Sequence, residues 1–130
     1  MYELTTLSFG QYQLVLNTLN LSIAVLGGFA LVFALMLSSV DTVYRVSLAL
    51  MAAVVAMAAY HYLRIYQNWS VAFTLESGVY TPNGTPFNYA YRYTDWIGTV
   101  PLILAATVLV LDLGRKKARA WLRASSSRRC

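Results

Sequence analysis

The sequence predicts an all-α integral membrane protein with three transmembrane helices and a short hairpin-like loop between the second and third. Hydrophobic residues make up 58% of the 130 residues and charged residues only 12%, whereas a soluble domain has about 25% charged residues. The hydrophobic residues are concentrated in three long runs, each with the roughly 20 residues that a bilayer crossing requires. This pattern excludes an ordinary soluble domain.

The first predicted helix covers about residues 8–39, because no ionisable acid or base occurs between Glu3 and Asp41. Its acidic start, its length and the lack of a small-residue cleavage site distinguish it from a signal peptide. We therefore expect it to remain in the chain. Gly27 and Gly28 near its centre predict the close approach of a neighbouring helix.

The second predicted helix covers about residues 42–67, with Asp41 or Thr42 as its N-cap. Its short connection to the first helix makes the two antiparallel neighbours. The next segment, FTLESGVYTPNGTPF, alternates apolar and polar residues on both sides of Ser77 and Gly78. Pro82, Asn83 and Gly84 form a second turn signal in the same segment. Alternation around these turn signals predicts a small β-hairpin over the helix ends.

The third predicted helix covers about residues 88–113, with Gly114 as its stop. Pro101 lies inside this segment, and membrane helices tolerate proline where neighbouring groups satisfy the freed carbonyl. We expect a kink near Ile97, with the Thr99 hydroxyl helping to satisfy the carbonyl. Residues 1–113 then form one transmembrane domain.

Residues 114–130 form a basic tail that carries seven of the ten Lys and Arg residues and no acid. Basic residues beside a span stay in the cytoplasm, so the amino terminus and the hairpin are expected outside. The tail directly follows a span and has no nucleic-acid-binding motif, so we expect no nucleic acid partner. A single His and the single Cys130 give no metal site and no internal disulfide. No motif of an enzyme is present.

A few polar residues interrupt the second and third helices near their outer ends. Counting at ~1.5 Å per residue places His61 and Asp95 at the same depth, roughly 10 Å below those ends. Arg64 and Arg92 lie one turn further out on the same faces, which predicts a polar ladder between the helices. An acid so deep in a membrane indicates ion or proton movement, although either arginine alone also fits a side chain that reaches for the interface.

Three segments resemble microbial rhodopsins over about residues 5–113. FNYAYRYTDWIGTVPLIL is similar to their third helix, which carries an Arg-Tyr-x-Asp-Trp-x-x-Thr-x-Pro pattern. AAYHYLRIYQNWSVAF resembles the second helix of the xanthorhodopsin and proteorhodopsin branch, and LSFGQYQLVLNTLNLSIA resembles the first helix of xanthorhodopsin. The resemblance implies the amino-terminal part of a seven-helix bundle that encloses retinal, bound as a protonated Schiff base to a lysine on the seventh helix.

The resemblance also implies a role for each matching residue. Asp95 resembles the Schiff-base counterion and first proton acceptor, His61 the histidine that hydrogen-bonds this acceptor, and Arg92 the gate toward the exit side. The implied retinal pocket consists of Tyr62, Trp96, Thr99 and Ile103.

Two positions depart from the pumping relatives of this branch. Ala106 stands where they carry the carboxylic acid that re-protonates the Schiff base. The only lysines are Lys116 and Lys117 in the basic tail, so we expect that this chain alone cannot bind retinal covalently. The ending ASSSRRC is typical of a truncated or non-native end.

The leading hypothesis is an amino-terminal fragment of a light-driven outward proton pump in the bacterial inner membrane, with retinal as cofactor only when the missing helices are supplied. One alternative is a fragment of a light-sensing rhodopsin. The other is a non-transporting three-helix membrane protein that forms homo-oligomers or binds a partner through Gly27, Gly28 and the alanines of the second helix.

Overall fold

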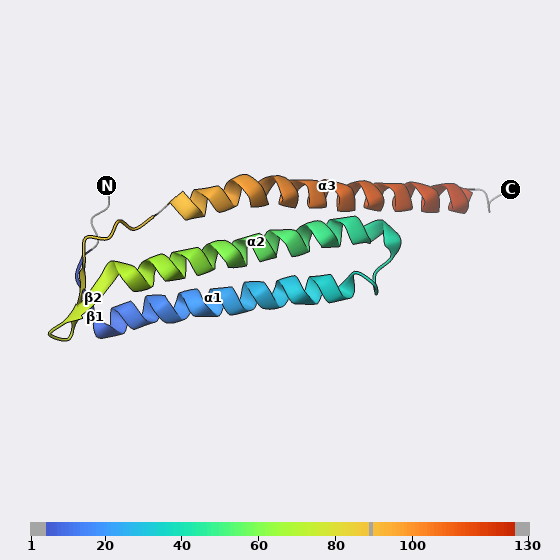
Figure 1. Ribbon diagram of the computed structural model, residues 1–130. Helices are drawn as coiled ribbons and strands as arrows, with labels where there is room; N and C mark the ends of the chain where they lie inside the picture. The colour runs from blue at the N-terminus through green and yellow to red at the C-terminus, as the bar shows by residue number, and fades with distance from the viewer. Residues whose placement is uncertain (1–4, 89, 127–130) are drawn as a thin grey trace.

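Three long helices lie side by side in the computed structural model (Figure 1), which describes residues 5–88 and 90–126, without the side chains of residues 113 and 117–126. The helices are α1 (Phe9–Met36), α2 (Thr42–Ala72) and α3 (Ala90–Ser126), and the strands are β1 (Leu7–Ser8), β2 (Phe73–Glu76) and β3 (Val79–Pro82). Helix α2 lies in the middle and packs against both α1 and α3. All three helices are long and apolar enough to cross a membrane, which confirms the predicted architecture.

The helix starts follow the sequence signals. Ser8 and Gln11 form a capping box at the start of α1, in which the Ser8 hydroxyl accepts a hydrogen bond from the Gln11 main-chain N–H. Asp41 is the N-cap residue of α2, as predicted, but its carboxylate makes no cap hydrogen bond. The predicted end at 67 is five residues short, because α2 remains helical until Ala72, directly before β2.

The predicted hairpin is present between α2 and α3. Ser77 and Gly78 form its two-residue turn with φ angles of 50° and 84°, and Glu76 pairs with Val79 across it. Two positive φ angles are the signature of the type I′ turn, whose twist matches that of paired strands. The structure adds a third strand that the sequence did not reveal, because β1 pairs with β3 through Leu7 and Tyr80.

An aromatic cluster attaches this small sheet to the ends of α1 and α2. The ring of Tyr12, which is only 5% exposed, stacks on Tyr80 with 3.6 Å between the ring centroids. Trp69 and Phe73 pack on the other sides of Tyr12. The side-chain amide of Asn83 also donates a 2.8 Å hydrogen bond to the carbonyl of Val71. The sheet therefore covers one end of the bundle, called the hairpin end below.

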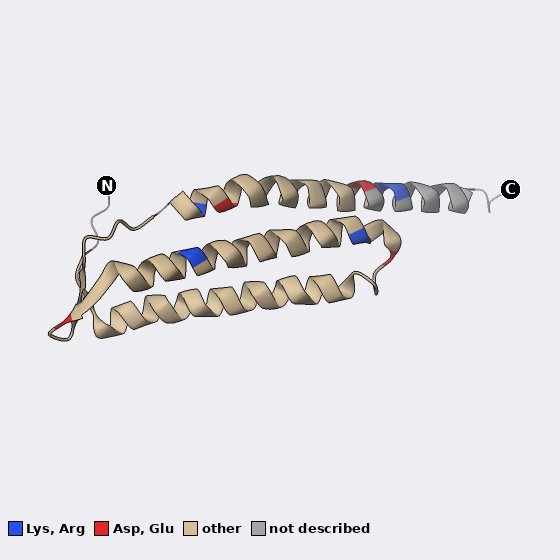
Figure 2. Cartoon of the chain, in the orientation of Figure 1, with Lys and Arg blue, Asp and Glu red and all other residues tan. Residues whose placement is uncertain are grey.

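Helix α3 continues past Gly114 to Ser126, so the predicted stop at Gly114 is wrong. A glycine inside a helix costs only about 1 kcal/mol relative to alanine, and strong helix formers follow it here. Lys116 also pairs with Asp112 across Gly114, with 2.7 Å between Nζ and Oδ2. Figure 2 shows these charges at the far end of the apolar part of α3, whereas α1 carries none.

The prediction for the Thr99 hydroxyl is also wrong, and the one for Gly27 and Gly28 is not tested by contacts within the described residues. The Thr99 hydroxyl donates to the carbonyl of Asp95 at 2.9 Å and not to that of Ile97, the carbonyl left without its helical donor by Pro101. A Cβ added at Gly27 or Gly28 would meet nothing within 4 Å. These two glycines face open space, and α1 approaches α2 along other residues.

Candidate functional site

The structure brings together the two polar residues that the depth count placed at one level. His61 on α2 and Asp95 on α3 face each other, with 3.2 Å between Nδ1 and Oδ1, and their side chains are 13% and 15% exposed. They belong to different helices, so the contact depends on how α2 and α3 pack. A carboxylate and an imidazole at this distance can share or exchange a proton.

Nδ1 of His61 also lies 2.9 Å from the carbonyl oxygen of Met57, one turn earlier on α2. Both neighbours of this nitrogen are hydrogen-bond acceptors, so Nδ1 must carry a hydrogen. Oδ1 of Asp95 is buried and accepts no aligned hydrogen bond from the described residues, which shows that the contact with Nδ1 is close but poorly directed. Asp95 therefore keeps an unused acceptor, and a buried acceptor without a donor is costly.

A cavity of about 380 Å³ opens beside this pair, within the range of small-molecule sites. All three helices contribute to its lining, which consists of Leu19, His61, Tyr62, Ile65, Arg92, Asp95 and Trp96. Arg92 is exposed and lines the cavity without an ion pair to Asp95 within the part of the chain that the structure describes. The cavity thus combines one carboxylate, one imidazole and one guanidinium with aromatic walls.

Arg64 is not part of this group, so the predicted ladder with two arginines is only half formed. Its guanidinium donates to the hydroxyl of Tyr91 at 3.1 Å and to the side-chain oxygen of Gln67 at 3.0 Å. The same guanidinium carbon lies 5.5 Å from the centre of the Tyr91 ring. The hydrogen bond from Arg64 to Tyr91 links α2 to α3 on the hairpin side of the His61 and Asp95 pair.

Two of the four residues matched to a retinal pocket line this cavity, and the other two lie outside its lining. Tyr62 and Trp96 line the cavity beside Asp95. Thr99 is 5% exposed and lies between the helices, where its hydroxyl bonds to the main chain of Asp95. Ile103 is 39% exposed and lies outside the cavity lining.

Ala106, matched to the position of the cytoplasmic proton donor, is 2% exposed at the interface between α2 and α3. Its carbonyl accepts a 3.1 Å hydrogen bond from the hydroxyl of Ser47. Ser47 was not singled out from the sequence, although a lone hydroxyl in an apolar helix is a signal for a bond between helices. Met57 and Gly98 were missed as well, and Gly98 lies one turn from Asp95.

Comparison with known proteins connects this arrangement to a family. Residues 13–127 match the bacteriorhodopsin-like protein family. The solved structure of xanthorhodopsin, described as a light-driven ion pump with dual chromophore, matches with a TM-score of 0.81 and 44% identity over 83% of this chain and 43% of that chain. A thermophilic rhodopsin matches with a TM-score of 0.81 and 49% identity over 84% of this chain and 43% of that chain.

The chain spans less than half the length of either of these two rhodopsins. The comparison with curated proteins gives no match. The family match covers most of the sequence and includes both residues of the carboxylate and imidazole pair. The chain therefore belongs to the bacteriorhodopsin-like family of microbial rhodopsins.

Proposed function

We propose that this chain supplies the counterion half of the retinal site in a light-driven outward proton pump, with Asp95 as the proton acceptor. The observation that carries the proposal is the buried Oδ1 of Asp95, which lies beside a cavity and accepts no aligned hydrogen bond from the residues that the structure describes. An ionised carboxylate in an apolar membrane helix needs a cationic or hydrogen-bonding partner. His61 provides only a poorly directed contact. Asp95 therefore lacks a well-aligned hydrogen-bond donor among the described residues.

Retinal would meet the need of Asp95 for a cationic donor, because a protonated Schiff base supplies a positively charged N–H. On illumination, retinal would also move that group. Asp95 would accept the hydrogen bond of the N–H, while Tyr62 and Trp96 provide aromatic walls beside it. Lys116 and Lys117, the only lysines of the sequence, lie on α3 far beyond Asp95 toward the other end of the helix. The lysine that holds retinal would therefore come from helices outside this sequence.

The positions of the residues support the roles that the resemblance implies. Oδ1 of Asp95 would receive the proton, and the hydrogen on Nδ1 of His61 would stabilise the carboxylate while it is still charged. The guanidinium of Arg92, on the same cavity and one turn closer to the hairpin end, adds positive charge on that side. A proton leaving Asp95 toward the hairpin end would pass this cation, which fits an exit in that direction.

The experiment is to express the chain together with helices four to seven of a xanthorhodopsin-like protein, add retinal, and record the visible absorption and the light-driven acidification of the medium. We expect a visible band and acidification from the wild type. Asp95→Asn should shift the band to the red and abolish the acidification. Asp112→Asn is the matched control, because Asp112 lies on the same helix in an exposed pair with Lys116, and it should behave as the wild type.

Two outcomes would refute the proposal. The first is that both parts insert but give no visible band, which would show that these helices do not complete a retinal site. The second is undiminished acidification by Asp95→Asn. A chain that forms stable homo-oligomers in the first case would instead favour the three-helix interaction protein.

Ala106 favours a second candidate, a light sensor of the same family. It is buried and has no carboxyl group where pumps of this branch carry the proton donor. A sensor would give the visible band with a slow return to the dark state and no net acidification. The same experiment therefore separates a sensor from a pump.

We also propose that the protein lies in a bacterial inner membrane with its hairpin end outside and residues 114–130 in the cytoplasm. The support is the excess of basic residues after Asp112, because such residues remain on the cytoplasmic side. Protease accessibility of a tag at each terminus in intact cells tests the orientation. Cleavage of a carboxyl-terminal tag from outside would contradict it.

A further inference from the structure

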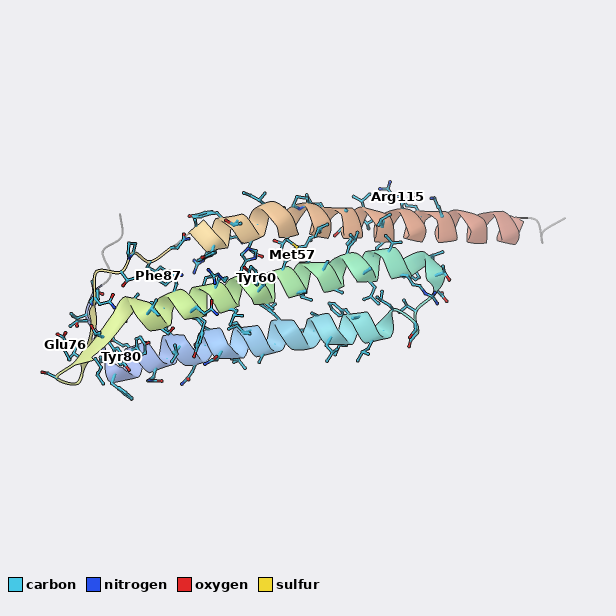
Figure 3. The ribbon with its side chains drawn as sticks, in the orientation of Figure 1. Met57, Tyr60, Glu76, Tyr80, Phe87 and Arg115 are labelled. Carbon is cyan, nitrogen blue, oxygen red and sulfur yellow. The ribbon has the colours of Figure 1, made fainter. Side chains whose placement is uncertain are left out.

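The end of the Met57 side chain packs against α3 at Gly98, one turn away from the His61 and Asp95 pair. The space above Gly98 is called the notch below. A Cβ added at Gly98 would collide with Cε of Met57 and would lie 3.9 Å from its sulfur. At every other glycine in the described part of the chain, an added Cβ would meet nothing within 4 Å. Figure 3 shows Met57 between α2 and α3. Gly98 is therefore a point of close contact between these two helices.

Met57 also contacts the pair through its main chain. Its carbonyl oxygen lies 2.9 Å from Nδ1 of His61, and the same nitrogen lies 3.2 Å from Oδ1 of Asp95. One residue thus holds the histidine ring through its backbone and packs on α3 through its side chain. Gly98 in turn lies on α3 one turn after Asp95. The notch and the pair share the same two helices at nearly the same level.

We propose that Gly98 is a positioning residue, whose missing side chain seats the end of Met57 and thereby sets α2 against α3 so that His61 meets Asp95. Its consequence for proton acceptance rests on the proposed function, but the geometric effect does not. Small residues allow close packing of membrane helices, and methionine fills irregular gaps because its chain is flexible.

Met57 and Gly98 are themselves half-buried, and buried residues adjoin them on both helices. Val54 on α2 and Thr99 on α3 are 6% and 5% exposed. With a methyl group at position 98, the end of Met57 would have to leave the interface or the two helices would have to separate. We expect the bundle to survive the change, because the Met57 side chain is flexible. We expect the distance between His61 and Asp95 to increase, because Met57 can no longer pack against α3 at position 98.

The ring of His61 has few polar neighbours that could mask this effect. Asp95 and Arg92 face the shared cavity from α3, and Leu19 is the only contribution of α1 to it. On its own helix, the ring of Tyr60 lies 5.4 Å away, Tyr62 lines the same cavity, and Arg64 is bound to Tyr91 and Gln67. Asp95 is the carboxylate that contacts His61.

The test is a magnetic-resonance distance measurement on the full chain in lipid bilayers, with isotope-labelled histidine nitrogens and aspartate carboxyl carbons. His61 is the only histidine of the sequence, so its ring gives a single set of nitrogen signals. A dipolar coupling between Nδ1 and the carboxyl carbon reports the contact with Asp95 directly. No retinal is needed, so this result does not depend on whether the chain is part of a pump.

We expect a strong coupling in the wild type and loss of most of it in Gly98→Ala. Gly28→Ala is the matched control, because it makes the same chemical change on α1 where nothing lies within 4 Å, and its coupling should equal that of the wild type. Met57→Ala empties the notch without a collision and should weaken the coupling. In the double variant of Gly98→Ala with Met57→Ala, the new methyl group on α3 occupies the space that the methionine left. This variant should restore much of the coupling.

Full coupling in Gly98→Ala would overturn the proposal, and so would equal losses in Gly98→Ala and Gly28→Ala, which would indicate a general effect of alanine. If Gly98→Ala fails to insert, an unchanged coupling in Met57→Ala would overturn it. The expected couplings together with undiminished acidification by Asp95→Asn in the reconstituted assembly would leave the positioning role standing and refute only the proposed function.

Discussion

The hydroxyl of Ser47 on α2 donates a 3.1 Å hydrogen bond to the main-chain oxygen of Ala106 on α3. Ser47 is 6% exposed and Ala106 is 2% exposed, so the bond is shielded from both water and lipid. It joins the two helices far from the hairpin end, whereas the contact between His61 and Asp95 joins them near it. Together with the bond from Arg64 to Tyr91, these polar contacts join α2 to α3 at several levels along the helices.

Replacing Ser47 tests the contribution of the buried bond. Ser47→Ala should lower the free energy of unfolding by about 0.6 kcal/mol, the average for hydrogen bonds between membrane helices. The measurement is the midpoint of detergent denaturation followed by helix content. Ser22→Ala is the control, because the Ser22 hydroxyl bonds within α1 to the carbonyl of Thr18. Equal midpoints for the two variants would contradict a role for Ser47 between the helices.

The link between Arg64 and Tyr91 gives a second prediction. Tyr91→Phe removes the hydroxyl that accepts the 3.1 Å hydrogen bond but keeps the ring beneath the guanidinium. Since Arg64 is partly in contact with solvent, the loss should be smaller than that caused by Ser47→Ala. The denaturation midpoint measures it, with Tyr93→Phe as control because Tyr93 is 63% exposed. A larger loss than in Ser47→Ala would show that Arg64 is more strongly coupled to α3 than its exposure indicates.

The hairpin turn gives a third prediction. Gly78 has a φ of 84°, which an alanine adopts only with strain of about 1–3 kcal/mol. Gly78→Ala should therefore weaken the pairing of β2 with β3 and speed the hydrogen exchange of the amides there. Gly10→Ala, on α1 with open space around it, should leave the exchange of these amides unchanged. Equal protection in both variants would argue against the type I′ turn.

Restoring an acid at position 106 gives a fourth prediction, which applies to the assembly reconstituted with retinal. In the proposed pump, Ala106→Glu should accelerate the return to the dark state by roughly 10²-fold, the lower range for a positioned general acid. The recovery of the visible band after a flash measures the rate. Ala105→Glu is the control, because Ala105 is exposed on the same helix. An unchanged rate would show that position 106 does not lead protons to the retinal site.

The membrane helices and the meeting of His61 with Asp95 were predictable from the sequence. Apolar runs of this length indicate transmembrane helices. The rise per residue of a helix then converts a count of residues into depth in the membrane. The count did not reveal the direction in which each side chain points. Arg64 was therefore grouped with Asp95 by depth, although it turns to Tyr91.

Features that depend on distant partners were not predictable. Strand β1 has two residues and no local signature, since it forms only because β3 offers it an edge. The close contact at Gly98 within the described residues was not predicted, because its partner Met57 lies far away in the sequence. Gly114 suggested a helix stop, but α3 continues through it into Arg115 and Lys116.

The pairing of Leu7 with Tyr80 imposes an order on biosynthesis. When the ribosome has made α1 and α2, Leu7 has no strand to pair with, because its partner has not yet been translated. A helix pair of α1 and α2 alone therefore has no complete sheet over its end. Only after β3 has been made can the three strands close over that end of the bundle.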